Sequence, residues 1–445
     1  MNEETIFADP KDFWYYTQNC LTCRDVEDTD EVNHRLVTFL TTVATHIKIH
    51  VNDDQDLYRC GLYLVDSPLY VENTVFCVAK ELTLLLMDQL PQSVKLVLSY
   101  MLLLDCKRDS STLQVIQDHR GFEVFYRSLH SLFETLAVMD GDSGDSGTVG
   151  TMKKTCTAQL DTLFQMCKFL SISAEELAIM DTFFVNYIFE SLVVTDIEED
   201  MLNASKFRFI LAVNEQFMIA CRDDPKLENR VFTTIQQHVS SRNFSECLLV
   251  FFNRVEDTCL QIMISKILYL ILTTPDTMDL FYHNDLNVLV DVLLRELTNL
   301  SEEEENTRNT FLRVLHPLLK NEQFAQTPYK KDQLRNILRY FAGESENKFW
   351  NQTETTQRLA KRCLSVAWLQ DKPATEEKQP DEVQPSPTDS SPTTPRLPYL
   401  ELIHSNDSQT SLASISKKRP PPPLPRKAMR IIGGPSPQVT ARTIR

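Results

Sequence analysis

Two cysteines, Cys20 and Cys23, form the only Cys-x-x-Cys pair of the chain. A zinc site needs four ligands, and no second pair of cysteines or histidines follows at a suitable spacing. A thioredoxin-like redox site would need a βαβ context, which the neighbouring sequence does not predict. We therefore interpret both residues as ordinary reduced cysteines. The eleven cysteines are scattered, mostly within apolar helical patterns, which is typical of a protein from a reducing compartment.

The motifs that position phosphates, nucleophiles or catalytic metals are absent from the sequence. It contains no GxxxxGK[ST], GxGxxG, GxSxG or HExxH pattern. The nine histidines are scattered, and without a pocket the abundant carboxylates cannot be assigned to an acid–base pair. We therefore expect a protein that is not an enzyme and that needs neither a metal nor a cofactor.

The most specific local motif is a proline run flanked by bases, KKRPPPPLPRK, over residues 417–427. Such a run adopts the polyproline II helix, which fits aromatic grooves with little further loss of entropy. The bases on both sides match RxxPxxP in one orientation and PxxPx[KR] in the other, which indicates an SH3 ligand. Profilin or a WW domain could compete for the same prolines, and a solvated spacer is the alternative. The predicted SH3-binding residues are Arg419, Pro420, Pro421, Pro422, Pro423, Leu424, Pro425, Arg426 and Lys427.

The composition changes after Asp371, where we place a domain boundary. Residues 371–445 hold 14 of the 21 prolines and cannot bury enough apolar surface to offset their ordering entropy, so we predict a disordered tail. The tail carries 11 basic and 8 acidic residues, which leaves 34 basic and 54 acidic residues in 1–370. This excess of acid argues against nucleic-acid binding and against an anionic membrane. No apolar run reaches the length of a membrane span, and the N-terminus does not resemble a secretory signal, so we expect a cytoplasmic protein.

The stretch 244–300 indicates that residues 1–370 form a stack of helices. Apolar residues recur there at three- and four-residue steps, Pro275 ends the first helix, and Asn284 or Asp285 can cap the next. Ser173 and Glu176 form a predicted capping box. We read residues 140–150, with four of the nine glycines, as a flexible loop between two helical halves. The predicted helices are 31–51, 71–89, 92–105, 120–139, 156–170, 174–194, 205–221, 226–241, 246–254, 258–272, 285–300, 308–320, 330–342 and 354–370.

No stretch of residues 1–370 alternates as a strand does, so the predicted class is all-α. Short helices in close succession favour an armadillo/HEAT-like solenoid. A compact irregular helical domain is the alternative, because no fixed-period repeat is present. The aromatic cluster from Phe13 to Tyr16 is expected to cover the first helix pair as a cap, and a partner anchor is the alternative.

Two blocks of this region resemble a known family. FYHNDL at 281–286, continuing through 288–291 to 295–297, resembles the signature block of the WISH/DIP leucine-rich family, and LRVLHPLL at 312–319 is similar to its next helix. The resemblance is clearest over about 200–370. Animal members of the family carry an N-terminal SH3 domain, which this sequence does not show. Its proline motif is instead similar to the fungal, low-dye-binding branch of cortical actin-patch proteins.

The resemblance implies an armadillo-like domain that binds the Arp2/3 complex and activates it without a preformed filament. The product would be linear actin filaments that seed branched networks during endocytosis, so the chain would act at cortical actin patches and contact actin only indirectly. Charged residues in the resembling blocks are the candidates for partner contact: Arg295, Glu296 and Arg313. The alternatives are a cytoskeletal scaffold without nucleation activity and an armadillo-type regulator of formins or kinases.

Overall fold

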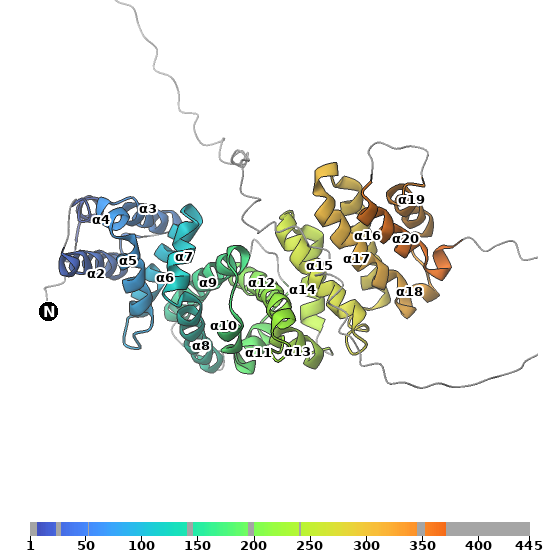
Figure 1. The fold of residues 1–445 in the computed structure, drawn as a ribbon. Helices are drawn as coiled ribbons and strands as arrows, with labels where there is room; N and C mark the ends of the chain where they lie inside the picture. The colour runs from blue at the N-terminus through green and yellow to red at the C-terminus, as the bar shows by residue number, and fades with distance from the viewer. Residues whose placement is uncertain are drawn as a thin grey trace, which may run out of the picture. The chain divides into compact units, whose positions relative to one another are not determined.

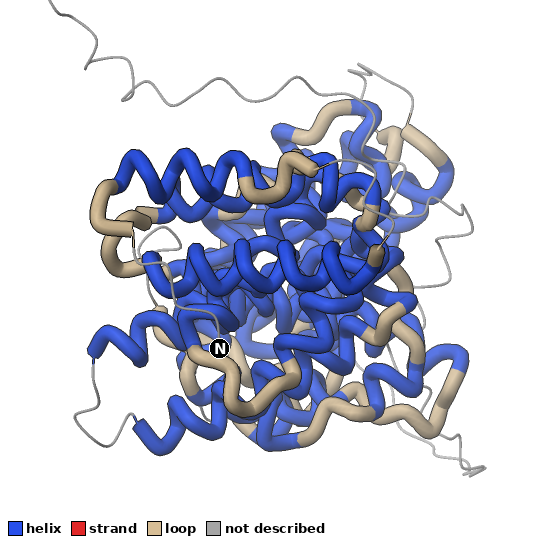
Figure 2. Tube along the Cα trace, turned by 90° about the vertical axis from the view of Figure 1, so that its left-hand side faces the viewer, coloured by secondary structure: helices blue, strands red, loops and turns tan. Residues whose placement is uncertain are grey.

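The computed structural model describes residues 7–23, 28–51, 53–139, 146–194, 200–239, 242–344 and 352–370. These residues form twenty α-helices and two 3-10 helices, with no strand among them (Figures 1 and 2). The predicted all-α class is therefore confirmed. The predicted boundary at 371 and the whole proline-rich tail lie outside the described residues.

The first ten helices run from the N-terminus to the middle of the chain: α1 (Pro10–Asn19), α2 (Thr29–His46), α3 (Asp54–Val65), α4 (Pro68–Glu72), α5 (Thr74–Leu85), α6 (Gln92–Arg108), α7 (Ser111–Asp118), α8 (Gly121–Met139), α9 (Ser146–Phe169) and α10 (Ala174–Ala178). The others follow: α11 (Thr182–Glu190), α12 (Met201–Asp223), α13 (Arg230–Gln237), α14 (Arg242–Arg254), α15 (Thr258–Thr273), α16 (His283–Asn299), η1 (Glu302–Glu304), α17 (Glu305–Lys320), α18 (Glu322–Gln326), α19 (Lys331–Phe341), α20 (Glu354–Leu364) and η2 (Ala367–Leu369).

One row of helices connects the whole array. Helix α2 packs on α6, α6 on α9, α9 on α12, α12 on α15, α15 on α17, and α17 on α20. The other helices pack beside this row, and Figure 1 shows each helix next to its near neighbours in sequence. We call these seven helices the central row. A structure in which each unit contacts mainly its neighbours is a helical solenoid, as the succession of short helices predicted.

Buried apolar side chains hold the helices together. Leu268 of α15 and Leu293 of the adjoining α16 are fully buried, as the periodicity in 244–300 predicts. Helix α15 ends at Thr273, just before Pro275. None of the described helices combines the length and the apolarity that crossing a membrane requires.

The N-terminal cap is also as expected. The predicted aromatic cluster lies in α1, which packs against α2 and α3. Phe13 is fully buried, and its ring lies 5.4 Å from that of His46 and 5.2 Å from that of His50. These contacts close the N-terminal end of the described helices over the apolar side of α2.

Several predicted elements differ from the structure. The predicted helices 31–51, 226–241 and 354–370 are longer than α2, α13 and α20, and the predicted helix 71–89 corresponds to the end of α4 and to α5. Residues 174–194 form two short helices and not one, because Asp181 accepts a hydrogen bond from the Phe184 amide at 2.8 Å and starts α11. The Ser173–Glu176 capping box that starts α10 is confirmed. The loop predicted over 140–150 is too long, since 146–150 are the first residues of α9. Glycine is tolerated in a first turn, so its density misled the prediction there; residues 140–145 lie outside the described residues.

The start of α16 and four further helices were also not foreseen. Tyr282 is the N-cap of α16, and Asp285 contributes from the third helical position by accepting a hydrogen bond from the Tyr282 amide at 3.0 Å. Helices α1, α3, α7 and α18 were not predicted. The longest of these has 12 residues, which leaves few turns in which periodicity can be recognised.

Candidate functional site

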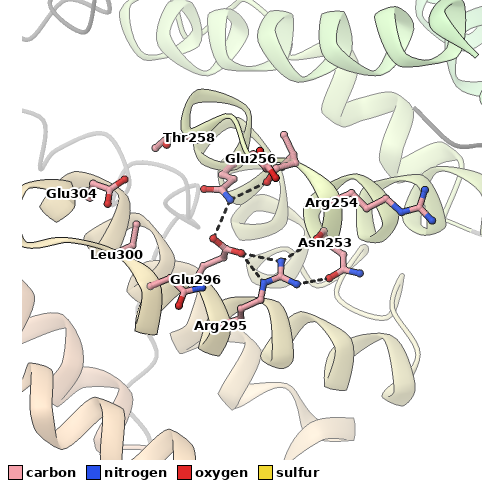
Figure 3. Close-up of a pocket in the computed structure, with 11 residues that line it drawn as sticks. Asn253, Arg254, Glu256, Thr258, Arg295, Glu296, Leu300 and Glu304 are labelled. Carbon is pink, nitrogen blue, oxygen red and sulfur yellow. Dashed lines mark hydrogen bonds and ion pairs between the residues drawn. The ribbon is translucent and has the colours of Figure 1, made fainter. Parts of the chain in front are cut away.

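A pocket of about 360 Å³ lies where α14, α15 and α16 meet, and two of the three predicted partner-binding residues line it (Figure 3). Arg295 and Glu296 lie near the C-terminal end of α16. Asn253 is in the last turn of α14, and Gln261 is in the first turn of α15. The pocket is thus formed where two helices end and a third begins.

The guanidinium of Arg295 holds the end of α14. Its Nη1 donates to Asn253 Oδ1 at 2.9 Å, and its Nη2 donates to the backbone oxygen of Asn253 at 3.0 Å. Its Nε donates to Glu296 Oε1 at 2.9 Å. The last carbonyls of a helix have no partner within the helix, and a basic side chain often supplies one. Arg295 therefore positions α14 against α16.

Glu296 extends this network to α15. Gln261 is buried, and its Nε2 donates to Glu296 Oε2 at 3.2 Å and to the backbone oxygen of Val255 at 3.1 Å. Both carboxylate oxygens of Glu296 therefore have a partner within the chain. Arg295 and Glu296 have a structural role in joining three helices, and their contact with a partner protein stays a prediction.

The pocket is lined mainly by polar and charged side chains. Arg254, Glu256 and Glu304 line it with charges of both signs. Within the described ranges no three His, Cys, Asp or Glu side chains come together to hold a metal ion. The lining therefore combines hydrogen-bond donors and acceptors.

Arg313, the third predicted residue, is on α17 and does not line this pocket. Its guanidinium is partly buried, and this burial lowers its pKa; the neighbouring positive charge of Arg358 on α20 lowers that pKa further, while Tyr269 on α15 opposes the shift. Arg313 thus belongs to the surface of the central row. The structure brings Arg295 and Glu296 together and places Arg313 elsewhere.

The Cys-x-x-Cys pair has no reactive thiolate at Cys20. Burial raises the pKa of the Cys20 thiol to about 12, and its Sγ donates to the backbone oxygen of Thr17. Cys20 is therefore a protonated thiol at neutral pH. Cys20 and Cys23 are both free, in agreement with the interpretation of reduced cysteines.

Sequence reasoning missed the residues that complete the pocket, Asn253 and Gln261. A polar side chain at the start of the otherwise apolar α15 was the signal available for Gln261, but its partner on α16 could not be identified from spacing. The predicted SH3-binding residues, from Arg419 to Lys427, lie outside the described residues. Their role stays a prediction.

Comparison with known proteins shows where this chain belongs. The model of the SPIN90/Ldb17 leucine-rich domain family matches residues 199–334, which include the pocket and Arg313. Among curated relatives, Protein LDB17 of Eremothecium gossypii is 40% identical over 367 residues, covering 79% of this chain and 80% of the relative. Protein LDB17 of Saccharomyces cerevisiae is 36% identical over 396 residues, covering 81% and 80%.

More distant similarities cover less of the chain or are weaker. Protein dip1 of Schizosaccharomyces pombe is 32% identical over 218 residues, covering 47% of this chain and 57% of the relative. The match to a crystal structure of an engineered protein covers 79% of this chain and 73% of that chain, with 15% identity and a TM-score of 0.37. The identity to the two LDB17 proteins extends over four-fifths of their length, so this chain belongs to the SPIN90/Ldb17 leucine-rich domain family.

Proposed function

We propose that this chain activates the Arp2/3 complex and nucleates linear actin filaments without a preformed filament, seeding branched networks at endocytic cortical actin patches. The observation that carries the proposal is the 40% identity to Protein LDB17 over 80% of that relative. The activity itself comes from the WISH/DIP family that residues 281–297 and 312–319 resemble.

The fold supports an activator that acts by binding alone. A solenoid offers a large surface of defined shape, and contact with one conformer of a multisubunit partner shifts its population by the differential affinity. Moving such an equilibrium from about 1:99 to about 99:1 requires roughly 10⁴-fold tighter binding to the active conformer. No catalytic residue is needed for this mechanism.

In the same proposal the tail recruits the protein. The proline motif at 417–427 binds SH3 domains of the endocytic machinery, and its bases add an attraction that salt screens. The tail therefore determines where the activator acts, while the helical domain carries out the activation.

Actin assembly with purified components tests the proposal. Pyrene-labelled actin is mixed with Arp2/3 complex and the full chain, without preformed filaments, and products are imaged by fluorescence microscopy. We expect a shorter lag and linear filaments, and no effect when the Arp2/3 complex is omitted. Binding of the complex without any acceleration would identify a scaffold instead, and the absence of both binding and acceleration would refute the proposal.

A further inference from the structure

Six helices of the central row each carry a basic side chain that is partly or fully exposed. These residues, which we call the basic stripe, are Lys107 on α6, Lys168 on α9, Arg208 on α12, Lys266 on α15, Arg313 on α17 and Arg358 on α20. The stripe is unexpected on a chain with a net charge of −17.

Side-chain contacts join the first half of the stripe. Asp161 on α9 lies between two of its residues, with Lys107 Nζ 3.9 Å from Asp161 Oδ2 and Arg208 Nη2 3.9 Å from Asp161 Oδ1. Ser205, on the same side of α12, donates to Asp161 Oδ1 at 2.7 Å. Helices α6, α9 and α12 therefore present these bases along one continuous surface.

The stripe continues from α9 and α12 to α15. Asp161 and Lys168 are seven residues apart, as are Arg208 and Glu215, and this spacing places each pair on one side of its helix. Lys266 forms an ion pair with Glu215. Lys168 Nζ lies 3.6 Å from an oxygen of Asp257, the N-cap of α15.

The last part of the stripe runs over α15, α17 and α20. Arg313 interacts electrostatically with Tyr269 of α15 and with Arg358 of α20. Helices α17 and α20 pack together, so these two positive charges lie close enough to influence each other. Arg358 is exposed and Arg313 is partly exposed, so Arg358 presents its positive charge to the solvent at this end of the stripe.

Carboxylates pair with four of the six bases but are outnumbered by the stripe: Asp161 contacts Lys107 and Arg208, Glu215 contacts Lys266, and the N-cap Asp257 contacts Lys168. Beyond their first turns, the six helices themselves contain only Asp105, Asp161, Glu215 and the terminal Asp223 of α12. The first three are only 7%, 6% and 8% exposed. Asp161 and Glu215 hold their basic partners in place from below, which reduces the entropy that ordering long side chains would cost on binding.

We propose that the basic stripe docks an acidic segment of a partner protein. Residues 1–370 have an excess of 20 acidic residues, which repels long polyanions such as nucleic acid. An acidic segment that lies along the stripe contacts mainly the basic side chains, so this repulsion affects it less. The tail 371–445 has more basic than acidic residues and is a poorer match as a whole. Where the partner is the Arp2/3 complex, this inference rests on the proposed function.

Binding of a fluorescein-labelled 20-residue oligoglutamate peptide to the full chain tests the stripe, measured by anisotropy in 50 mM salt. We expect saturable binding that weakens as salt rises, a loss of about tenfold for Arg358→Glu and about threefold for Lys107→Ala. The matched control is Lys226→Glu, an exposed lysine between α12 and α13, with less than about a twofold effect. Circular dichroism melting confirms that each variant is folded. If Arg358→Glu and Lys226→Glu reduced the affinity for the peptide equally, the peptide would not bind at the basic stripe and the proposal would be wrong.

Two further experiments test whether nucleic acid or the tail of the same chain binds the basic stripe instead of a partner protein. A 20-base-pair DNA duplex that bound more tightly than the peptide, and depended on Arg358, would overturn the assignment to a protein partner. The tail is tested in the full chain by changing its first acidic residues to amides, at Asp371, Glu376, Glu377, Asp381 and Glu382. If these changes raised the affinity for the peptide tenfold, the tail would itself occupy the stripe, and docking of a partner protein would be refuted. An unchanged affinity supports docking of a partner protein.

Repeating the actin assay with Arg358→Glu distinguishes this inference from the proposed function. We expect slower Arp2/3-dependent assembly, in proportion to the lost peptide affinity. If the wild-type chain fails to stimulate assembly while peptide binding still depends on Arg358, the proposed function fails and the stripe is supported. Stimulation that is unchanged in Arg358→Glu would exclude the Arp2/3 complex as the partner of the stripe.

Discussion

Glu81 of α5 is a carboxyl group that helix packing has removed from water. It is fully buried, and neither carboxyl oxygen has a hydrogen-bond partner among the described residues. Burial raises its pKa well above the usual value, and the nearby Asp105 raises it further. Asp105 itself accepts hydrogen bonds from Tyr70 at 3.0 Å and Thr112 at 3.1 Å. Glu81 is therefore protonated in the folded protein at neutral pH.

This protonation predicts a stability that falls as pH rises. The folded state keeps the Glu81 proton above the pH at which the unfolded chain loses it, so the stabilisation is complete below about pH 4.5. It is then lost as pH rises toward the folded-state pKa, with a slope of up to about 1.4 kcal/mol per pH unit for one group. Urea unfolding between pH 5 and 8 should show a smaller decrease for Glu81→Gln than for wild type. The exposed Glu246→Gln is the control, and a decrease in Glu81→Gln as large as in wild type would contradict the assignment.

A second residue-level prediction concerns the buried face of α16. Leu293 is fully buried, so Leu293→Asp places an unpaired charge in the core and should cost about 4 kcal/mol or more, or prevent folding. Val288 on the same helix is 41% exposed, and Val288→Asp should change the melting temperature little. Thermal melting of the two variants measures the difference. Similar melting of Leu293→Asp and wild type would show that this face is not core.

At the scale of elements, Gln216 of α12 holds the connection between α9 and α10. Its Oε1 accepts from the Ile172 amide at 3.0 Å, and its Nε2 donates to the backbone oxygens of Cys167 at 2.7 Å and Leu170 at 2.9 Å. One side chain thus satisfies three backbone groups at the end of a helix. The buried Gln216 joins neighbouring members of the central row in a way that apolar packing cannot.

Replacing Gln216 with leucine should therefore destabilise the protein although it adds apolar surface. Three backbone groups lose their partner, and we expect a loss of about 2–3 kcal/mol in the free energy of unfolding. Urea denaturation measures this loss, with Gln237→Leu at the exposed end of α13 as the control. Equal midpoints for the two variants would show that solvent replaces the contacts of Gln216.

For the whole molecule, the proposal predicts that recruitment and activation separate. The double substitution Pro422→Ala/Pro425→Ala should abolish capture by immobilised SH3 domains, because it removes the prolines shared by both motif orientations. Filament seeding with purified Arp2/3 complex should stay within about twofold of wild type, since recruitment contributes nothing among freely mixed proteins. Removal of residues 371–445 should have the same two effects and reduce patch recruitment in cells. Loss of activation in the purified assay would make the tail part of the activator.

The sequence by itself determined the fold class and much of the core. Helical periodicity and capping are local, so Leu268, Leu293 and the Ser173–Glu176 box could be identified without knowledge of distant residues. Helix lengths were less accessible, because the break between α10 and α11 depends on Asp181, whose other oxygen lies 2.9 Å from His130 Nε2 on α8, 51 residues earlier. Local patterns contain no information about such a contact.

Only the tertiary structure decided what the charged residues of the resembling blocks do. Arg295 contacts Asn253, 42 residues away in sequence, and Glu296 contacts Gln261, 35 residues away, so both join helices that the sequence shows as separate. The basic stripe likewise exists only because packing places six separated helices in one row and buries Asp161 and Glu215 between them. Local periodicity predicts which face of its helix a side chain occupies, but only the packing of distant helices determines which side chain it contacts.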